Sequence, residues 1–106
     1  MVVGDRVHVS GTAPVMPDGG PPPASAYEQA KRCLEIIVAA LAEAGAAPAD
    51  VVRTRMFITS PEHWEGVARA HGEVFTSVRP ASTCVVTGLL DPRWLVEIEA
   101  DAVLQG

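Results

Sequence analysis

Three acidic side chains alternate along one segment near the C-terminal end of the sequence. Glu97, Glu99 and Asp101 occupy every second position, and a strand would project them from one face at spacings of roughly 6 to 7 Å. The functional interpretation of this row is that one of the three acids lines a site. The same row is typical of a solvated strand face, and Arg53 and Arg55 on a neighbouring strand would neutralise it. The pattern alone favours the solvated or salt-bridged face.

The cysteines and histidines form no separate catalytic or metal motif. Cys33 and Cys84 lie in unrelated segments without metal-type spacing, which favours two reduced, packed thiols. No base or helix N-terminus is evident beside Cys84, so an inert buried thiol is expected there. His71 lies on an apolar helical stripe, where a satisfied core or interface histidine is more typical than a catalytic base. No metal is predicted because the cysteines lack metal-type spacing, and no cofactor is predicted because the sequence has neither a phosphate loop nor a dinucleotide fingerprint.

The first part of the sequence predicts a strand, a connection and a helix. Residues 7–10 alternate between apolar and polar, which indicates a strand or hairpin that runs into Gly11. That glycine is interpreted as serving a bend or a close backbone approach. The proline-rich stretch 17–25 cannot continue a ladder or a helix and is expected at the surface. Ser25 and Glu28 have capping-box spacing ahead of an apolar stripe, which predicts the first helix.

The second part predicts two strands around a second helix and a final strand. Residues 51–59 alternate, and the even positions from 52 to 58 are expected on one face. A helix is predicted from Pro61 to about Val78, followed by strands over 82–87 and from Leu95 to Leu104. This order predicts an α+β fold in which two helices cover one face of a mixed sheet. The other face is left unexplained.

Length and charge narrow the class of protein. A chain of 106 residues predicts a single domain over 1–106, and a domain of this size leaves little depth for a closed cavity. A pocket is therefore expected to borrow walls from a partner subunit. The net charge of −5 argues against a nucleic-acid partner. The sequence starts without a basic leader region, and its longest apolar stretch, 36–42, falls far short of the ~20 residues of a membrane span, so a cytoplasmic protein without a membrane partner is expected.

Four segments taken together resemble the Rid family, also called YjgF. They are, in collinear order, Val9–Pro14, Ala44–Thr59, Arg79–Val86 and Leu95–Val103. The resemblance implies a chorismate-mutase-like subunit whose uncovered sheet face joins those of two others in a homotrimeric barrel. It also implies a small imino or keto acid-like ligand in a cleft between subunits, and hydrolysis of reactive enamines and imines such as 2-aminoacrylate.

The resemblance also assigns candidate site residues. It implies that Glu97 positions the attacking water and that Gly11 and Cys84 belong to the substrate-binding positions. Ser82 stands where the archetypal Pro-Ala-Arg-Ser motif has the arginine that grips the substrate carboxylate, and a hydroxyl supplies neither the charge nor the two-pronged grip. Arg79, three residues earlier, is a candidate to reach the cleft, although a surface arginine at a helix end accounts for it as well. The sequence given contains no counterpart of the family's Gly-Pro-Tyr-Ser type motif.

Three functions stay open at this point. The first is a divergent Rid-type trimer in which Glu97 positions water for hydrolysis. The second is a non-catalytic ligand-binding or regulatory trimer that lost the chemistry with the change to Ser82. The third is ribonuclease or translation-inhibitor activity, a label that some relatives carry, and the acidic balance argues against it.

Overall fold

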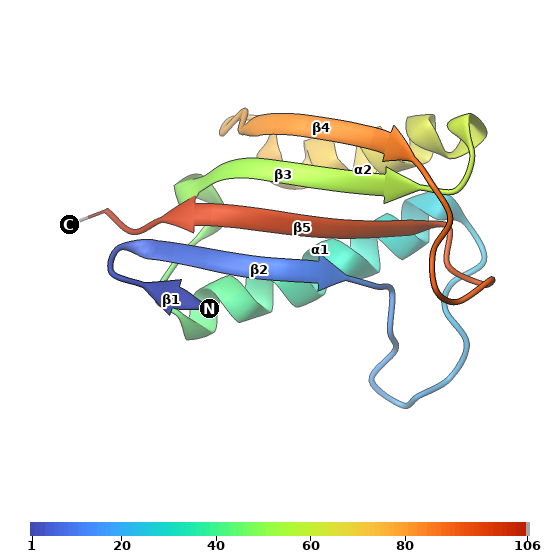
Figure 1. Ribbon diagram of the computed structural model, residues 1–106, viewed down its shortest axis with the longest axis horizontal. Helices are drawn as coiled ribbons and strands as arrows, with labels where there is room; N and C mark the ends of the chain where they lie inside the picture. The colour runs from blue at the N-terminus through green and yellow to red at the C-terminus, as the bar shows by residue number, and fades with distance from the viewer. Residues whose placement is uncertain (106) are drawn as a thin grey trace.

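A mixed five-stranded sheet carries two helices on one of its faces (Figure 1). The computed structural model of the chain describes residues 1–105. The elements in chain order are β1 (Val2–Val3), β2 (Arg6–Thr12), α1 (Ala26–Glu43), η1 (Pro48–Asp50), β3 (Val51–Ile58), η2 (Pro61–His63), α2 (Trp64–Phe75), β4 (Ala81–Val86) and β5 (Val96–Val103). The strand order is β1-β2-β5-β3-β4; β4 pairs with β3 in parallel, and the other neighbours run antiparallel. The predicted α+β class is confirmed, and so is the face without helices.

Helix α1 begins and ends as its sequence predicts. The Ser25 hydroxyl accepts a hydrogen bond from the Glu28 N–H at 3.1 Å, which caps the first turn. At the other end Gly45 has a φ of +84°, and the Ala46 N–H donates to the Leu41 carbonyl at 2.8 Å. These bonds form a Schellman motif, which satisfies carbonyls that the helix leaves free. The apolar stripe between the caps is buried against the sheet at Ala30, Cys33, Leu34, Ile37 and Leu41.

The alternation of β5 is confirmed along its whole length. Val96, Ile98, Ala100 and Ala102 are at most 1% exposed and pack under the helices. The small side chains of Ala100 and Ala102 belong to the same core cluster as the apolar stripe of α1. The acidic residues between them therefore point to the uncovered face.

Strand β3 departs from the predicted alternation at its start. The alternation predicts Val52 on the same face as Thr54, Met56 and Ile58, but Val51 is buried with them and Val52 is 48% exposed. Val51 pairs with Ala102 and Arg53 pairs with Asp101, so Val52 has no partner on β5. This extra residue is a β-bulge, which shifts the phase of the strand by one position. From Thr54 onward the predicted phase is correct.

The second helix is shorter than predicted. The segment starting at Pro61 opens with the 3-10 turn η2, and α2 ends at Phe75 instead of about Val78. The N–H groups of Val78 and Arg79 both donate to the Phe75 carbonyl at 3.0 Å, which closes the helix. Arg79 has a φ of 53°, in the left-handed region that ends helices.

Candidate functional site

The uncovered face of the sheet carries a network of acidic and basic side chains. Arg55 on β3 donates from Nη1 to Glu99 Oε1 at 3.3 Å and to Asp101 Oδ2 at 3.2 Å. His8 on β2 lies with its Nδ1 2.7 Å from Asp101 Oδ1. Burial raises the pKa of Asp101, but the hydrogen bonds from His8 and Arg55 outweigh burial and leave this pKa below its usual value. The expected cross-strand neutralisation is thus present at Arg55.

Arg53 behaves differently from Arg55. Its Nη2 donates to Thr83 Oγ1 on β4 at 2.7 Å. Although Arg53 is paired with Asp101 in the strand register, neither a hydrogen bond nor an ion pair joins the two side chains within residues 1–105. The expectation that both arginines neutralise the acidic row is therefore wrong for Arg53.

Glu97 is the member of the acidic row that has no ionic partner within the described residues. It is half-buried and pairs with Phe57 in the register of β3 and β5. Its carboxylate lies against Gly11, where an added Cβ would be 2.8 Å from Oε2. A carboxylate whose lone pairs are free can accept a proton from water or hold a water molecule in place. The close backbone approach predicted at Gly11 is present, within the irregular pairing of β2 and β5 between Val9 and Thr12.

The other candidates lie on the opposite face of the sheet. Ser82 pairs with Thr54 and Cys84 pairs with Met56 in the parallel register of β3 and β4. Residues paired in this way project to the same side, and Thr54 and Met56 are buried on the helix side. The structure therefore brings Ser82 and Cys84 together along β4 and separates both from Glu97 and Gly11.

Arg79 lies in the turn that leads from α2 into β4. It is exposed, and its backbone N–H is held by the Phe75 carbonyl. Its side chain makes no ion pair or hydrogen bond within residues 1–105. The placement is compatible with both interpretations drawn from the sequence.

Neither cysteine has the surroundings of a nucleophile. Burial, together with the nearby charge of Glu97, raises the pKa of the Cys33 thiol to about 12. Burial also raises the pKa of Cys84, which is only partly covered. Cys84 is thus less enclosed than the inert buried thiol that the sequence predicts. Both groups are protonated thiols at neutral pH, so thiolate chemistry is not what this site offers.

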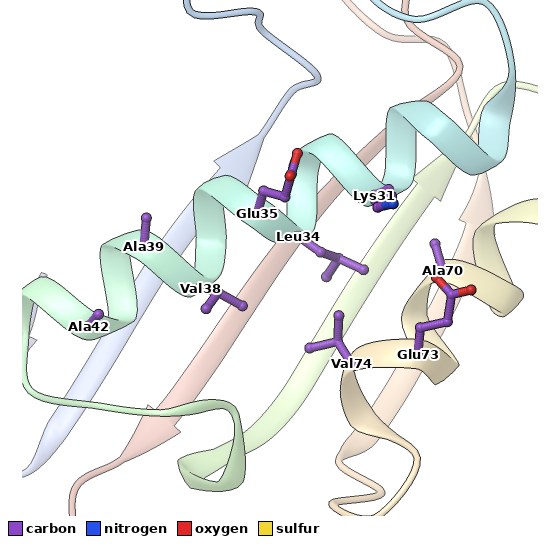
Figure 2. Close-up of a pocket in the computed structure, with 9 residues that line it drawn as sticks. All are labelled: Lys31, Leu34, Glu35, Val38, Ala39, Ala42, Ala70, Glu73 and Val74. Atoms are coloured by element: carbon purple, nitrogen blue, oxygen red, sulfur yellow. The ribbon is translucent and has the colours of Figure 1, made fainter.

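Two hollows on the helix side of the sheet are apolar. One, of about 490 Å³, is lined by Ile58, Pro61, Trp64, Cys84, Val85 and Val86. The other, of about 480 Å³, lies between α1 and α2 and contains none of the candidate residues (Figure 2). Within residues 1–105, no group of His, Cys, Asp and Glu side chains is arranged to hold a metal ion. No helix in this part of the chain is long and apolar enough to cross a membrane.

A chain of polar side chains crosses the core beside β4, and sequence reasoning did not find it. Thr54 Oγ1 lies 2.8 Å from His71 Nε2 and 2.8 Å from Ser82 Oγ. Thr54 is fully buried. Its hydrogen bond satisfies the His71 ring nitrogen, as the sequence predicts for a core or interface histidine. Burial lowers the pKa of His71, so its imidazole is neutral at pH 7. The available signal was a threonine at an inward position of an otherwise aliphatic strand face.

Comparisons with known proteins agree on one family. The family model described as endoribonuclease L-PSP matches residues 1–104. An uncharacterized protein of Streptomyces coelicolor is 40% identical over 103 residues, which cover 96% of this chain and 77% of that protein. The crystal structure of a member of the YjgF/YER057c/UK114 family from Mycobacterium tuberculosis has a TM-score of 0.86 at 38% identity, covering 97% of this chain and 82% of the other.

One relative has a name that describes an activity. "Putative reactive intermediate deaminase TdcF" of Escherichia coli is 31% identical over 104 residues, 95% of this chain and 81% of that protein. The crystal structure of TdcF with bound serine has a TM-score of 0.89 at 30% identity and covers 99% of this chain and 85% of the other.

Proposed function

The chain belongs to the YjgF or Rid family, and from this premise we propose that it binds a small metabolite between subunits of a homotrimer and hydrolyses an imine or enamine there. Glu97 positions the attacking water. The observation that carries this proposal is that Glu97 alone of the acidic row has no ionic partner within residues 1–105, whereas Glu99 and Asp101 are held by Arg55 and His8.

The separation of the candidate residues supports a site built from two subunits. Glu97 and Gly11 lie on the uncovered sheet face, whereas Ser82 and Cys84 lie on the helix side of β4. Strand β4 is at the edge of the sheet and exposes apolar side chains, with Val85 44% and Val86 53% exposed. An unprotected apolar edge of this kind suits a contact with a second copy of the chain. A neighbouring subunit at this edge would bring its own Glu97 face toward Ser82 and Cys84.

The chemistry needs one oriented water and one proton carrier. Water adds to the imine carbon while the Glu97 carboxylate accepts a proton from it, and the imine nitrogen takes up a proton. The resulting carbinolamine loses ammonia and leaves a carbonyl compound, so an imine and water give a carbonyl compound and ammonia.

Release of ammonia from freshly generated imines tests the proposal. The substrates are 2-iminopropionate and an aliphatic imine without a carboxylate, each compared with its rate of hydrolysis in buffer. Glu97→Gln is expected to lower the enzymatic rate on the order of a hundredfold. Glu99→Gln is the matched control and should keep the activity, because that carboxylate is bound to Arg55. No acceleration by the native protein would overturn the hydrolase, and a monomer in sedimentation analysis would overturn the shared site.

A non-catalytic binding or regulatory trimer is the second candidate. The observation that favours it is that Ser82, at the position of the family's arginine, is tied to Thr54 and supplies no charge. This candidate predicts that keto acids, amino acids or related small molecules raise the melting temperature without any turnover. Binding together with imine hydrolysis that depends on Glu97 would reject it.

A further inference from the structure

The polar chain from His71 to Ser82 runs from α2 through the buried Thr54 to the surface of β4. Figure 1 shows α2 lying behind β3 and β4, so His71 on α2 reaches the inward face of β3. Thr54 is the fully buried middle member, with partners at 2.8 Å on both sides. Ser82 is the exposed end, and its Oγ also lies 3.1 Å from the Pro80 carbonyl oxygen. The hydroxyl at position 82 is therefore held at a defined position and is open to a ligand.

Counting protons shows what this chain offers to a ligand. Each hydroxyl has one proton to donate, so Thr54 donates either to His71 or to Ser82. If Thr54 donates to His71, Ser82 donates to Thr54 and presents its lone pairs outward. If Thr54 donates to Ser82 instead, the proton of the Ser82 hydroxyl is directed to the Pro80 carbonyl or to the ligand. In both directions Ser82 is an uncharged hydrogen-bonding group.

Cationic side chains near β4 are mostly engaged elsewhere. Arg53 is bonded to Thr83, and Arg55 is bonded to Glu99 and Asp101 on the uncovered face. Arg79 is exposed in the turn before β4. A ligand carboxylate placed at Ser82 would exchange its hydration for one neutral hydrogen bond, which is unfavourable. A carbonyl or amide loses less on desolvation and is better matched to this position.

The surface next to Ser82 is apolar. Cys84 follows two positions later on the same face of β4 and lines the hollow of about 490 Å³ that also contains Trp64 and Val86. Trp64 is 46% exposed there, so an indole face is available for contact. No charged side chain lines this hollow within the described residues. An aliphatic group fits such surroundings because its burial removes apolar surface from water.

We propose that Thr54 and His71 orient the Ser82 hydroxyl so that position 82 receives an uncharged carbonyl or amide group of the ligand, while the hollow at Cys84 takes an attached aliphatic body. This inference rests on the proposed small-molecule site and names its ligand class, an uncharged carbonyl compound or imine. Ser82 is the contact residue, and Thr54 and His71 are positioning residues.

A pair of probes that differ only in charge tests the inference. 4-Methyl-2-oxopentanoate and its primary amide share one carbon skeleton, and binding of each to the ¹⁵N-labelled full chain is followed by NMR at the backbone amides of β4. We expect the amide to bind about tenfold more tightly than the acid, the effect of one well-matched hydrogen bond against an uncompensated carboxylate. Ser82→Arg should reverse the preference, because a guanidinium binds a carboxylate with two prongs.

Variants of the middle residue separate positioning from simple packing. Thr54→Val keeps the shape but breaks the chain, and should reduce the preference to less than about twofold; Thr54→Ser keeps the hydroxyl and should restore it. The ¹⁵N shift of His71 Nε2 should change in Thr54→Val and stay near the native value in Thr54→Ser. If Thr54→Val does not fold, Ser82→Ala at the exposed end should lose the same preference.

Several results would overturn the inference. These are equal binding of acid and amide to the native protein, an unchanged preference in Thr54→Val or Ser82→Ala, and no response of β4 to either probe. Preferred binding of the acid that disappears in Arg79→Ala would assign the cation to Arg79 and would also reject the inference. Because the readout is binding, an amide preference without imine hydrolysis rejects the proposed activity alone. Hydrolysis together with preferred acid binding rejects the ligand class alone.

Discussion

Gly11 and Glu97 are in direct contact across the neighbouring strands β2 and β5. A Cβ at the glycine would lie 2.8 Å from Oε2 and 3.2 Å from Cδ of the glutamate, closer than packed side chains allow. The atom in the way is the end of a flexible side chain, so a larger residue at position 11 moves the carboxylate and leaves the backbone in place. The backbone at Gly11 is outside the left-handed region and accommodates an L-residue.

We predict that Gly11→Ala lowers imine hydrolysis more than it lowers stability. Displacing the Glu97 carboxylate by about 1 Å costs on the order of tenfold to a hundredfold in rate. The melting temperature should change by only a few degrees. Ammonia release and thermal unfolding measure the two effects. Gly88→Ala is the matched control, since nothing lies within 4 Å of an added Cβ there. A full rate in Gly11→Ala would show that the position of this carboxylate does not matter.

The stability of the fold should depend on Asp101 in a defined pH range. Burial raises the pKa of Asp101, and the hydrogen bonds from His8 and Arg55 more than offset this and lower it. A carboxyl whose pKa is lower in the folded state stabilises the fold above its unfolded pKa of about 3.9, and this stabilisation is lost as pH falls through the folded value. The side chains are partly exposed, so the contribution is at most about 1 kcal/mol.

Urea unfolding at pH 7 and pH 3 checks this dependence. Asp101→Asn should be less stable than the native chain at pH 7, and the difference should shrink at pH 3. A difference that stays constant between the two pH values would assign the effect to packing instead of ionisation.

The elements that were predictable owe their form to nearby residues. The helix α1 stripe and the alternation of β5 follow from local periodicity, and Ser25 and Gly45 mark helix ends through bonds that span only a few positions. The features that could not be predicted from the sequence depend on pairing between distant segments. The exposure of Val52 comes from a bulge in β3 opposite β5. The contact of Thr54 with Ser82 depends on the register of β3 and β4, because these two residues are 28 positions apart in the sequence.

The same reasoning applies to the candidate site. The family resemblance named Glu97, Gly11, Ser82 and Cys84, but only the fold reveals that the first two lie on one sheet face and the last two on the other. The sequence also could not show which acid lacks an ionic partner, because Arg55 reaches Glu99 and Asp101 through the pairing of β3 with β5. Local alternation places side chains on a face and does not select their partners.

The two thiols should differ sharply in alkylation. Cys33 is fully buried with a pKa of about 12, so at pH 8 on the order of 10⁻⁴ of it would be thiolate. Cys84 is partly exposed, and its raised pKa makes it slow but accessible. Iodoacetamide on the native protein should therefore modify Cys84 first, as peptide mass spectrometry would show. Cys84→Ser should stay unmodified until denaturant is added. Early labelling of Cys33 would contradict the burial of its thiol under helix α1.

Gln29 is expected to be one of the costliest polar residues to remove. It is 1% exposed, and its Nε2 donates to the carbonyls of Pro23 and Arg93 at 2.8 and 3.0 Å. Its Oε1 accepts from the Leu95 N–H at 2.7 Å. One side chain thus ties the proline-rich connection and the segment entering β5 to helix α1.

Gln29→Ala leaves these three backbone groups without their partner, and should lower the free energy of unfolding by on the order of 2–3 kcal/mol. Gln29→Glu tests the donors separately, because a carboxylate still accepts from Leu95 but cannot donate to the two carbonyls. It should be destabilised as well, and more at pH 7 than at pH 3, where a protonated carboxyl regains one donor. Gln105→Ala, at an exposed position, is the control and should be nearly neutral. Urea unfolding of the three variants gives the comparison, and a neutral Gln29→Ala would mean that water replaces the side chain at all three groups.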